Sequence, residues 1–436
     1  MINTAEVFLW DTRIGIVHQD DDKPYITFEY DKDFVSSGIE VSPIMMKLST
    51  EQYQFQNLAG DTFRGAPGLV ADSFPDKFGS RIIERWIMEQ GRSLSNFNTI
   101  DRLCFAGTRG MGALEYRPVS GPECIIGSEI NLDKMVEFSS KVLSDKKELR
   151  LNEDERTGYT QLVQLGTSAG GARAKALIAR NDKTGEIKNG LTDLEDGFEY
   201  WLIKFDGVKK NGDHELQDSV EYTLIEYAYH LMAINAGINM EECRVLEKNG
   251  RHHFITKRFD RVGDMKLHMQ TLAALAHIDY NYPGLCSYEH AAEILKRIDP
   301  TMEDVEQFFR RMVFNVVMVN QDDHVKNISF LMDKEGRWKL SPAYDITFSY
   351  SPNNRWLKAH QMTINRKVEE ITTLDLLDAG GSMGIDSEKC KGIIMEIFSV
   401  ADNIEKYFEQ TGIREKTYTE LMKVINDNRI KSNLRF

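Results

Sequence analysis

Residues 320–327 read Asn320-Gln321-Asp322-Asp323-His324-Val325-Lys326-Asn327 and come directly after an apolar repeat of helical spacing. Within this stretch, Asp322 and Asn327 are five residues apart. An aspartate can orient a hydroxyl group and accept its proton, and an asparagine oxygen can bind a metal ion beside it. Considered alone, these aspartates would more often be turn or capping residues. The neighbouring sequence decides between the two interpretations.

A predicted hairpin links this stretch to a further aspartate. Apolar runs at 328–332 and 338–340 flank Asp333-Lys334-Glu335-Gly336, a sequence typical of a tight turn. The hairpin is expected to return the chain to the same site, where Asp345 follows Tyr344. Protein kinases have an aspartate and an asparagine at the spacing of Asp322 and Asn327, and a second metal-binding aspartate downstream. The joint spacing predicts an ATP-dependent kinase in which Asp322 is the catalytic base and Asn327 and Asp345 bind Mg²⁺, although Asp345 does not begin a D-F-G triplet.

An apolar run upstream carries the lysine that this chemistry requires. Lys204 lies near the end of the run Tyr200-Trp201-Leu202-Ile203-Lys204-Phe205, like the strand lysine with which kinases reach the α- and β-phosphates. Glu226, on the helix predicted to follow, is the expected partner of Lys204, because active kinases pair this lysine with a helix glutamate. Glu221 and Glu215 are alternatives for that pairing. A lysine at the end of a strand is otherwise usually just solvated.

A glycine-rich segment lies between two apolar runs and could lay backbone N–H groups over phosphates. It reads Gly166-Thr167-Ser168-Ala169-Gly170-Gly171-Ala172-Arg173-Ala174-Lys175. The segment matches neither a P-loop nor the G-x-G-x-x-G spacing. Without the downstream catalytic stretch, it would be interpreted as a flexible hairpin turn.

The length of 436 residues predicts two to three folding units of a soluble globular protein. We expect an α+β fold with a small N-terminal α+β subdomain at 1–125, a kinase-like N-terminal lobe at 126–265 and a helical C-terminal lobe at 266–436. In the first part, β-type runs occur at 7–10 and 25–28, and a helix is expected at 81–89. The second part should run as strand, glycine-rich turn, strand, hairpin, strand and long helix. Apolar periodicity predicts helices at 220–236, from a capping box at Thr301 and Asp304 up to residue 320, and near 390–408.

Composition limits the partners and the compartment. The formal net charge of −14 argues against a broad direct grip on nucleic acid, which depends on Lys and Arg contacts to phosphates. Any DNA contact is therefore expected to need a partner. Five cysteines are scattered without paired spacing, which favours a reducing cytoplasm over a disulfide or zinc framework. We expect neither a signal peptide nor a membrane span, because no stretch has the required charge pattern or apolar length.

With these segments identified, the chain resembles the HipA family of bacterial toxin–antitoxin kinases. Asn320-x-Asp322-x-His324-x-Lys326-Asn327 resembles the family's catalytic N-x-D-x-H-x-K-N block. The segment 168–175 is similar to its phosphate loop, and Arg258-Phe259-Asp260-Arg261 is similar to its R-F-D-R stretch. Near the N-terminus, Ala71-Asp72-Ser73-Phe74-Pro75-Asp76 and Gly110-Met111-Gly112-Ala113-Leu114 also resemble family segments, so the resemblance extends over nearly the whole length.

The resemblance implies a function and a set of partners. The chain would be a serine/threonine protein kinase that uses ATP and Mg²⁺ and inhibits growth as a toxin. A small helix-turn-helix antitoxin (HipB-like) would hold it in check, and operator DNA would be reached mainly through that antitoxin. The protein substrate would be a translation component such as an aminoacyl-tRNA synthetase. Autophosphorylation of Ser168 would switch the kinase off, because about two added negative charges in this loop would repel the phosphates of ATP.

The same resemblance implies which residues contact the nucleotide. Phe259 would lie at the adenine pocket, and Asp260 would contact the ribose. The implied cofactor-binding residues are Ser168, Ala169, Gly170, Gly171, Lys175, Lys204, Glu226, Phe259, Asp260, His324 and Lys326.

Two positions depart from the family pattern. Lys257 replaces an acidic residue expected before R-F-D-R, and Arg173-Ala174 replaces a Gln-Glu pair of some members. Neither departure removes a residue that phosphoryl transfer needs. Two other functions stay open at this point: a nucleotide-binding pseudokinase or regulatory module that works through a DNA-binding partner, and a small-molecule kinase.

Overall fold

The structure is a computed structural model that describes residues 1–58, 60–122, 130–143, 153–167, 173–191, 194–208 and 221–434. The chain forms two compact units. The first contains residues 1–41, 46–223 and 242–269, and the second contains 42–45, 224–241 and 270–436. Each unit is described by itself.

The first unit begins with an antiparallel sheet in the order β4-β3-β2-β1-β5. Alternate residues of its strands are buried, as in Phe28 and Tyr30, which is the pattern of a sheet with one face on a core. The strands are β1 (Thr4–Leu9), β2 (Thr12–His18), β3 (Thr27–Tyr30), β4 (Tyr53–Gln54) and β5 (Leu114–Arg117). The helices of this part are α1 (Lys32–Val35), η1 (Gln56–Leu58), α2 (Gly68–Ala71), α3 (Lys77–Glu89), η2 (Leu94–Asn96) and α4 (Thr99–Ala106).

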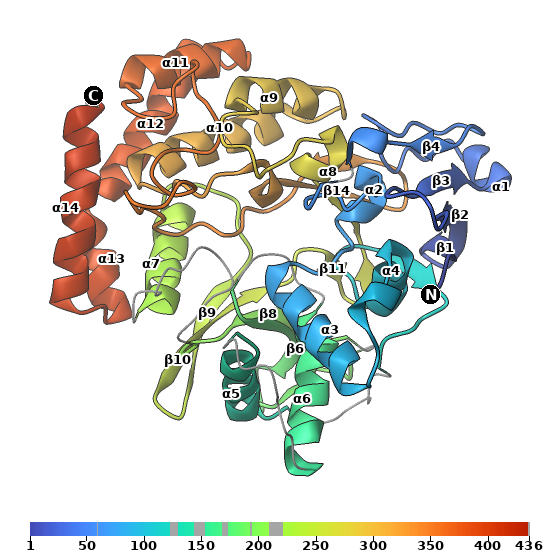
Figure 1. Ribbon diagram of the computed structural model, residues 1–436. Coiled ribbons are helices and arrows are strands. Elements are labelled where there is room, and N and C mark those ends of the chain that lie inside the picture. The colour runs from blue at the N-terminus through green and yellow to red at the C-terminus, as the bar shows by residue number, and fades with distance from the viewer. Residues whose placement is uncertain are drawn as a thin grey trace. The chain divides into compact units, whose positions relative to one another are not determined.

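A second antiparallel sheet, in the order β7-β6-β8-β10-β9, follows within the same unit. Its strands are β6 (Lys175–Asn181), β7 (Ile187–Asn189), β8 (Phe198–Lys204), β9 (Cys243–Lys248) and β10 (Arg251–Lys257), with a separate ribbon of β11 (Arg261–Val262) and β12 (Met265–Lys266). The helices α5 (Leu132–Leu143) and α6 (Glu153–Gly166) pack with α3 beside β6 and β8 (Figure 1). Ile82 of α3, Leu162 of α6 and Trp201 of β8 belong to one buried apolar cluster. A helix that precedes residue 125 is therefore part of the core of the predicted kinase lobe.

The second unit is mainly helical. It contains most of α7 (Tyr222–Asn235), then α8 (Leu272–Ala276), α9 (Tyr288–Lys296), α10 (Met302–Val317), η3 (Val325–Asn327), α11 (Thr373–Ser382), α12 (Ser387–Ala401), α13 (Ile404–Thr411) and α14 (Glu415–Lys431). A small sheet in the order β13-β14-β15 is formed by β13 (His268–Thr271), β14 (Ser329–Met332) and β15 (Trp338–Leu340). The helix α10 has the predicted capping box, with the Thr301 hydroxyl accepting from the Asp304 N–H and the Asp304 carboxylate accepting from the Thr301 N–H.

Several local predictions are confirmed. The hairpin after the catalytic stretch exists, with Phe330 opposite Leu340 and Met332 opposite Trp338. The helix predicted at 220–236 is α7, and Gly237 after it has a φ of +75°, a left-handed conformation that glycine adopts without strain.

Two predictions are wrong. The expected strand before the glycine-rich segment is the helix α6, because apolar residues such as Tyr159, Leu162 and Val163 recur at helical spacing. The single helix expected near 390–408 is two helices, α12 and α13, interrupted at Asp402 and Asn403. Both interrupting residues are of types that favour helix ends over helix interiors. In the part of the chain that the structure describes, no helix combines the length and apolar character that crossing a bilayer requires.

Candidate functional site

The catalytic stretch of the second unit begins where α10 ends. Val319 has a φ of +57°, a conformation that a β-branched residue rarely adopts. The buried Asn320 follows and is held at both its backbone and its side chain: its N–H donates to the carbonyl of Asn315 at 2.9 Å, and its Nδ2 donates to the Asn315 Oδ1 at 3.0 Å. The chain thus leaves the helix in a strained but anchored turn, an arrangement that is common at active sites.

The Asp322 carboxylate is accessible and oriented. Its side chain is 42% exposed. The Gln361 Nε2 donates to the Asp322 Oδ1 at 3.0 Å, and the His324 Nε2 lies 3.7 Å from the same oxygen. A general base must be reachable by the group whose proton it takes, and the exposed Asp322 carboxylate meets this requirement.

Asn327 and Asp345 line the same pocket as Asp322. The Asn327 Nδ2 donates to the Asp322 carbonyl at 2.8 Å, which leaves the amide oxygen of Asn327 to act as an acceptor. At the end of the hairpin, the Tyr344 hydroxyl donates to the Lys326 carbonyl at 2.8 Å and so ties the Asp345 segment to the catalytic stretch. Asp345 itself has a φ of +52°. The structure therefore brings the predicted base and both predicted metal ligands to one pocket.

Asp323 has a different role from its neighbour, because its side chain is fully buried. The Tyr288 hydroxyl donates to the Asp323 Oδ2 at 2.9 Å, and the His360 Nδ1 lies 2.9 Å from that oxygen. The Gln361 N–H donates to the Asp323 Oδ1 at 2.7 Å. Burial raises the pKa of Tyr288 well above its ordinary value, so this hydroxyl keeps its proton and donates. Asp323 thereby anchors the catalytic stretch to α9 and to the segment at 360–361.

His324 and Lys326 both contact one aromatic ring that sequence analysis did not single out. The Tyr280 ring centroid is 5.4 Å from that of His324, and the Lys326 Nζ lies 5.3 Å from the Tyr280 centroid. An ammonium group over an aromatic face is attracted by the ring. Tyr280 and Gln361, like Tyr288 and His360, come from segments distant in sequence, so no local sequence signal indicated these contacts.

The predicted phosphate lysine lies in the first unit, on β8. In the sheet, Lys204 stands opposite Lys175 on β6 and opposite Phe254 on β10, and its Nζ lies 5.7 Å from the Phe254 ring centroid. Glu226 is buried on α7 in the second unit, whereas the alternative Glu221 is a buried residue of the first unit. Glu215 lies outside the described residues. The pairing of Lys204 with Glu226 stays a prediction.

Half of the glycine-rich segment, residues 168–172 with Ser168, Ala169, Gly170 and Gly171, lies outside the described residues. Its last residue, Lys175, forms a buried ion pair in which its Nζ is 2.9 Å from the Asp76 Oδ2. The two side chains are 2% and 4% exposed. The other Asp76 oxygen accepts the N–H of Gly79 and so caps the N-terminus of α3. In this structure Lys175 therefore holds β6 to α3, and its predicted contact with the cofactor stays a prediction.

Asp260 is enclosed within the first unit. Its carboxylate accepts from Arg258 at 2.9 and 2.7 Å, from the Arg261 Nη1 at 2.8 Å and from the Gly112 N–H at 2.7 Å. Burial raises the pKa of Asp260, but the two guanidinium groups and the Gly112 N–H outweigh burial and keep it well below its ordinary value. Both carboxylate oxygens are engaged in these bonds, and the expected contact of Asp260 with the ribose stays a prediction. The R-F-D-R stretch also binds the predicted family segment at Gly110–Leu114, because Arg261 donates to the carbonyls of Gly110 and Gly112.

Three remaining positions of the sequence analysis also lie in the first unit. Phe259 is half-buried, so its expected place at an adenine pocket stays a prediction. Lys257 pairs with Glu199 on β8. The Arg173 guanidinium lies 4.4 Å from the ring centroid of Tyr222. Both departures from the family pattern are thus accommodated by local contacts.

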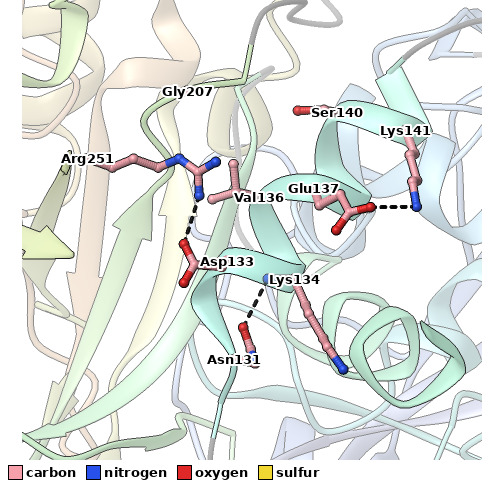
Figure 2. Close-up of a pocket in the computed structure, with 9 residues that line it drawn as sticks. All are labelled: Asn131, Asp133, Lys134, Val136, Glu137, Ser140, Lys141, Gly207 and Arg251. Carbon is pink, nitrogen blue, oxygen red and sulfur yellow. Dashed lines mark hydrogen bonds and ion pairs between the residues drawn. The ribbon is translucent and has the colours of Figure 1, made fainter. Parts of the chain in front are cut away.

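A shallow pocket on the first unit lies between α5 and the region around Arg251 (Figure 2). Four of its five charged side chains form two ion pairs: the Arg251 Nη1 is 2.8 Å from the Asp133 Oδ1, and the Lys141 Nζ is 2.7 Å from the Glu137 Oε1. None of the residues predicted to bind ATP, metal or substrate lines it. Among the described residues, no group of three or more His, Cys, Asp or Glu side chains is arranged to hold a metal ion.

Comparison with known proteins identifies the family of the chain. A family model described as the HipA-like C-terminal domain matches residues 167–404, and one described as the HipA N-terminal domain matches residues 5–117. A candidate kinase of Haemophilus influenzae is 23% identical over 206 residues, which cover 40% of this chain and 60% of that protein. The candidate kinase Y4dM of Sinorhizobium fredii is 27% identical over 197 residues, covering 42% of this chain and 45% of that protein. The chain therefore matches less than two thirds of the length of either relative.

A solved structure is similar over almost the whole chain. A chain of the Shewanella oneidensis toxin–antitoxin complex of HipA, HipB and operator DNA superposes with a TM-score of 0.64 at 15% identity, covering 98% of this chain and 96% of that one. At this identity the likeness establishes the fold. The predicted α+β, kinase-like fold is confirmed.

Proposed function

Because the chain belongs to the HipA family, we propose that it is an ATP-dependent serine/threonine protein kinase that inhibits growth as the toxin of a toxin–antitoxin pair. The observation that carries this proposal is the pocket shared by Asp322, Asn327 and Asp345. An accessible carboxylate stands there beside an amide oxygen and a second carboxylate. These are the groups that phosphoryl transfer to a hydroxyl requires.

In the proposed reaction, the bond from the γ-phosphorus of ATP to the bridging oxygen breaks, and ADP leaves with that oxygen. A new bond forms between the phosphorus and the acceptor hydroxyl oxygen, whose proton passes to Asp322. The Gln361 Nε2 donates to the Asp322 Oδ1, and the His324 Nε2 lies 3.7 Å from the same oxygen. Lys204 is the proposed contact to the α- and β-phosphates, supported by its place on an apolar strand.

The donor atoms at the pocket fit Mg²⁺. The ion prefers hard oxygen ligands and is usually held by one or two protein groups, with water and substrate phosphates completing its shell. The Asn327 amide oxygen and the Asp345 carboxylate are such ligands, since Asn327 uses its Nδ2 for the Asp322 carbonyl. When bound, Mg²⁺ neutralises charge on the phosphates.

The proposed partners follow from the family. A small helix-turn-helix antitoxin would bind the chain and connect it to operator DNA, and the net charge of −14 favours such indirect DNA contact. The protein substrate is proposed to be a translation component such as an aminoacyl-tRNA synthetase, and Ser168 is the proposed autophosphorylation site. A cytoplasmic location is proposed because the five cysteines are scattered without the paired spacing of a disulfide framework.

Asp322→Ala provides the direct test. The wild-type chain should transfer radiolabel from ATP to protein in the presence of Mg²⁺ and arrest growth when expressed, and Asp322→Ala should do neither. General-base removal typically costs about 10²- to 10⁴-fold in rate. Equal transfer by the two proteins would refute the kinase proposal.

Two further outcomes identify the rival functions. Nucleotide binding without Mg²⁺-dependent turnover would indicate a regulatory module. Label appearing only in small metabolites would indicate a small-molecule kinase. A phosphorylated Ser168 that is lost in Asp322→Ala would support the proposed off-switch.

A further inference from the structure

Gln361 connects the two adjacent aspartates of the catalytic stretch. Its side-chain Nε2 donates to the Asp322 Oδ1 at 3.0 Å, and its backbone N–H donates to the Asp323 Oδ1 at 2.7 Å. The two bonds span 39 and 38 positions of the sequence. One residue thus bonds the exposed, proposed base and its buried neighbour at the same time.

The backbone of Gln361 is itself held firmly. Its carbonyl accepts the Gly284 N–H at 2.7 Å, and the preceding residue, His360, places its Nδ1 2.9 Å from the Asp323 Oδ2. Asp323 is fixed in turn by the Tyr288 hydroxyl. Gln361 is only 5% exposed, so few other positions are open to its side chain. A donor with so little freedom can fix the direction of a carboxylate that is itself 42% exposed.

Resting on the proposed kinase function, we propose that Gln361 is a positioning residue that orients the Asp322 carboxylate toward the acceptor hydroxyl. An aspartate has freedom about two side-chain torsions, and an exposed one samples several orientations. A base that points away must reorient before each transfer, and small misplacements cost large factors in rate. The segment at 360–361 is therefore part of the catalytic machinery, although it lies outside the motifs that resemble kinase loops.

The test compares variants of Gln361 in the full-length chain, with Mg²⁺-dependent ATP turnover and autophosphorylation as readouts. Gln361→Leu keeps much of the volume and removes the donor. It should lower kcat about 10- to 100-fold and leave KM for ATP within about twofold, because only orientation is lost. Gln361→Asn, which retains a shorter amide, should recover part of the loss. Gln307→Leu is the matched control, since the Gln307 amide bonds the Gly237 carbonyl and the Asn239 N–H elsewhere in the second unit, and it should keep wild-type activity.

Gln361→Glu gives a readout that a merely structural role would not change. A second carboxylate against Asp322 disfavours ionisation of both, so the acidic limb of the rate profile should move to higher pH. Wild-type kcat and an unmoved pH profile in Gln361→Leu and Gln361→Glu would overturn the positioning role while leaving the kinase proposal intact, provided that Asp322→Ala is inactive. Absence of turnover in the wild type would overturn both. Equal losses in kcat and in ATP affinity, with no recovery in Gln361→Asn, would also refute the positioning role.

Discussion

Replacing Asp76 by asparagine should destabilise the first unit by about 3 to 5 kcal/mol, the usual cost of removing one partner from a buried ion pair. The Lys175 and Asp76 side chains are 2% and 4% exposed and lie 2.9 Å apart, so the Lys175 ammonium group would lose this carboxylate while it stays away from water. Asparagine retains an oxygen that can accept the Gly79 N–H, so the cap of α3 is kept. The variant therefore measures the effect of the lost negative charge alone.

Urea unfolding followed by tryptophan fluorescence measures this loss, because Trp201 is fully buried in the core that α3 and β6 share. The double variant Asp76→Asn, Lys175→Met also removes the buried ammonium charge and should regain most of the stability. Two results would refute this reasoning: a loss below about 1 kcal/mol in Asp76→Asn, which is the range of exposed pairs, or a double variant no more stable than the single one.

The remaining predictions concern two other buried groups of the first unit. Asp260→Asn leaves Arg258 and Arg261 buried together without their carboxylate and should cost about 3 to 5 kcal/mol by urea unfolding. The exposed Asp182→Asn is its control, and equal small losses in both would contradict the prediction. Burial lowers the pKa of His253 to about 4, and its Nδ1 accepts the Asp206 N–H at 3.0 Å, so the fold prefers neutral imidazole. This histidine therefore binds a proton at higher pH in the unfolded chain than in the folded one. The free energy of unfolding should fall by about 3 kcal/mol as the pH drops from 6.5 to 4. Replacing this histidine by glutamine, which keeps an acceptor without titrating, should flatten that part of the pH dependence, and an unchanged slope would show that other groups cause it.

The local features of the candidate site could be predicted because they depend on residues close together in sequence. The hairpin between Met332 and Trp338 follows from turn residues between apolar runs, and the Thr301 cap follows from a four-residue pattern. Asp322 and Asn327 are only five residues apart, so the Asn327 amide can bond the Asp322 carbonyl within one tight turn of the backbone. The wrong prediction of a single helix near 390–408 also had a local cause. The break between α12 and α13 depends on Asp402 and Asn403, whose preference for helix ends competes with a continuous apolar stripe.

Sequence by itself thus indicated which residues are candidates for phosphoryl transfer, and it determined how the chain turns around them. Only the tertiary structure decided what surrounds those residues. It brought the N–H of Gly112, which is 148 positions away, to the Asp260 carboxylate. It also paired Lys175 with Asp76 and hydrogen-bonded the Gln361 amide to Asp322. The physical reason is that turns and caps are formed by hydrogen bonds within a few residues. A buried charge, in contrast, takes its partner from whichever segment the packed core brings beside it, and that choice is made by the whole fold.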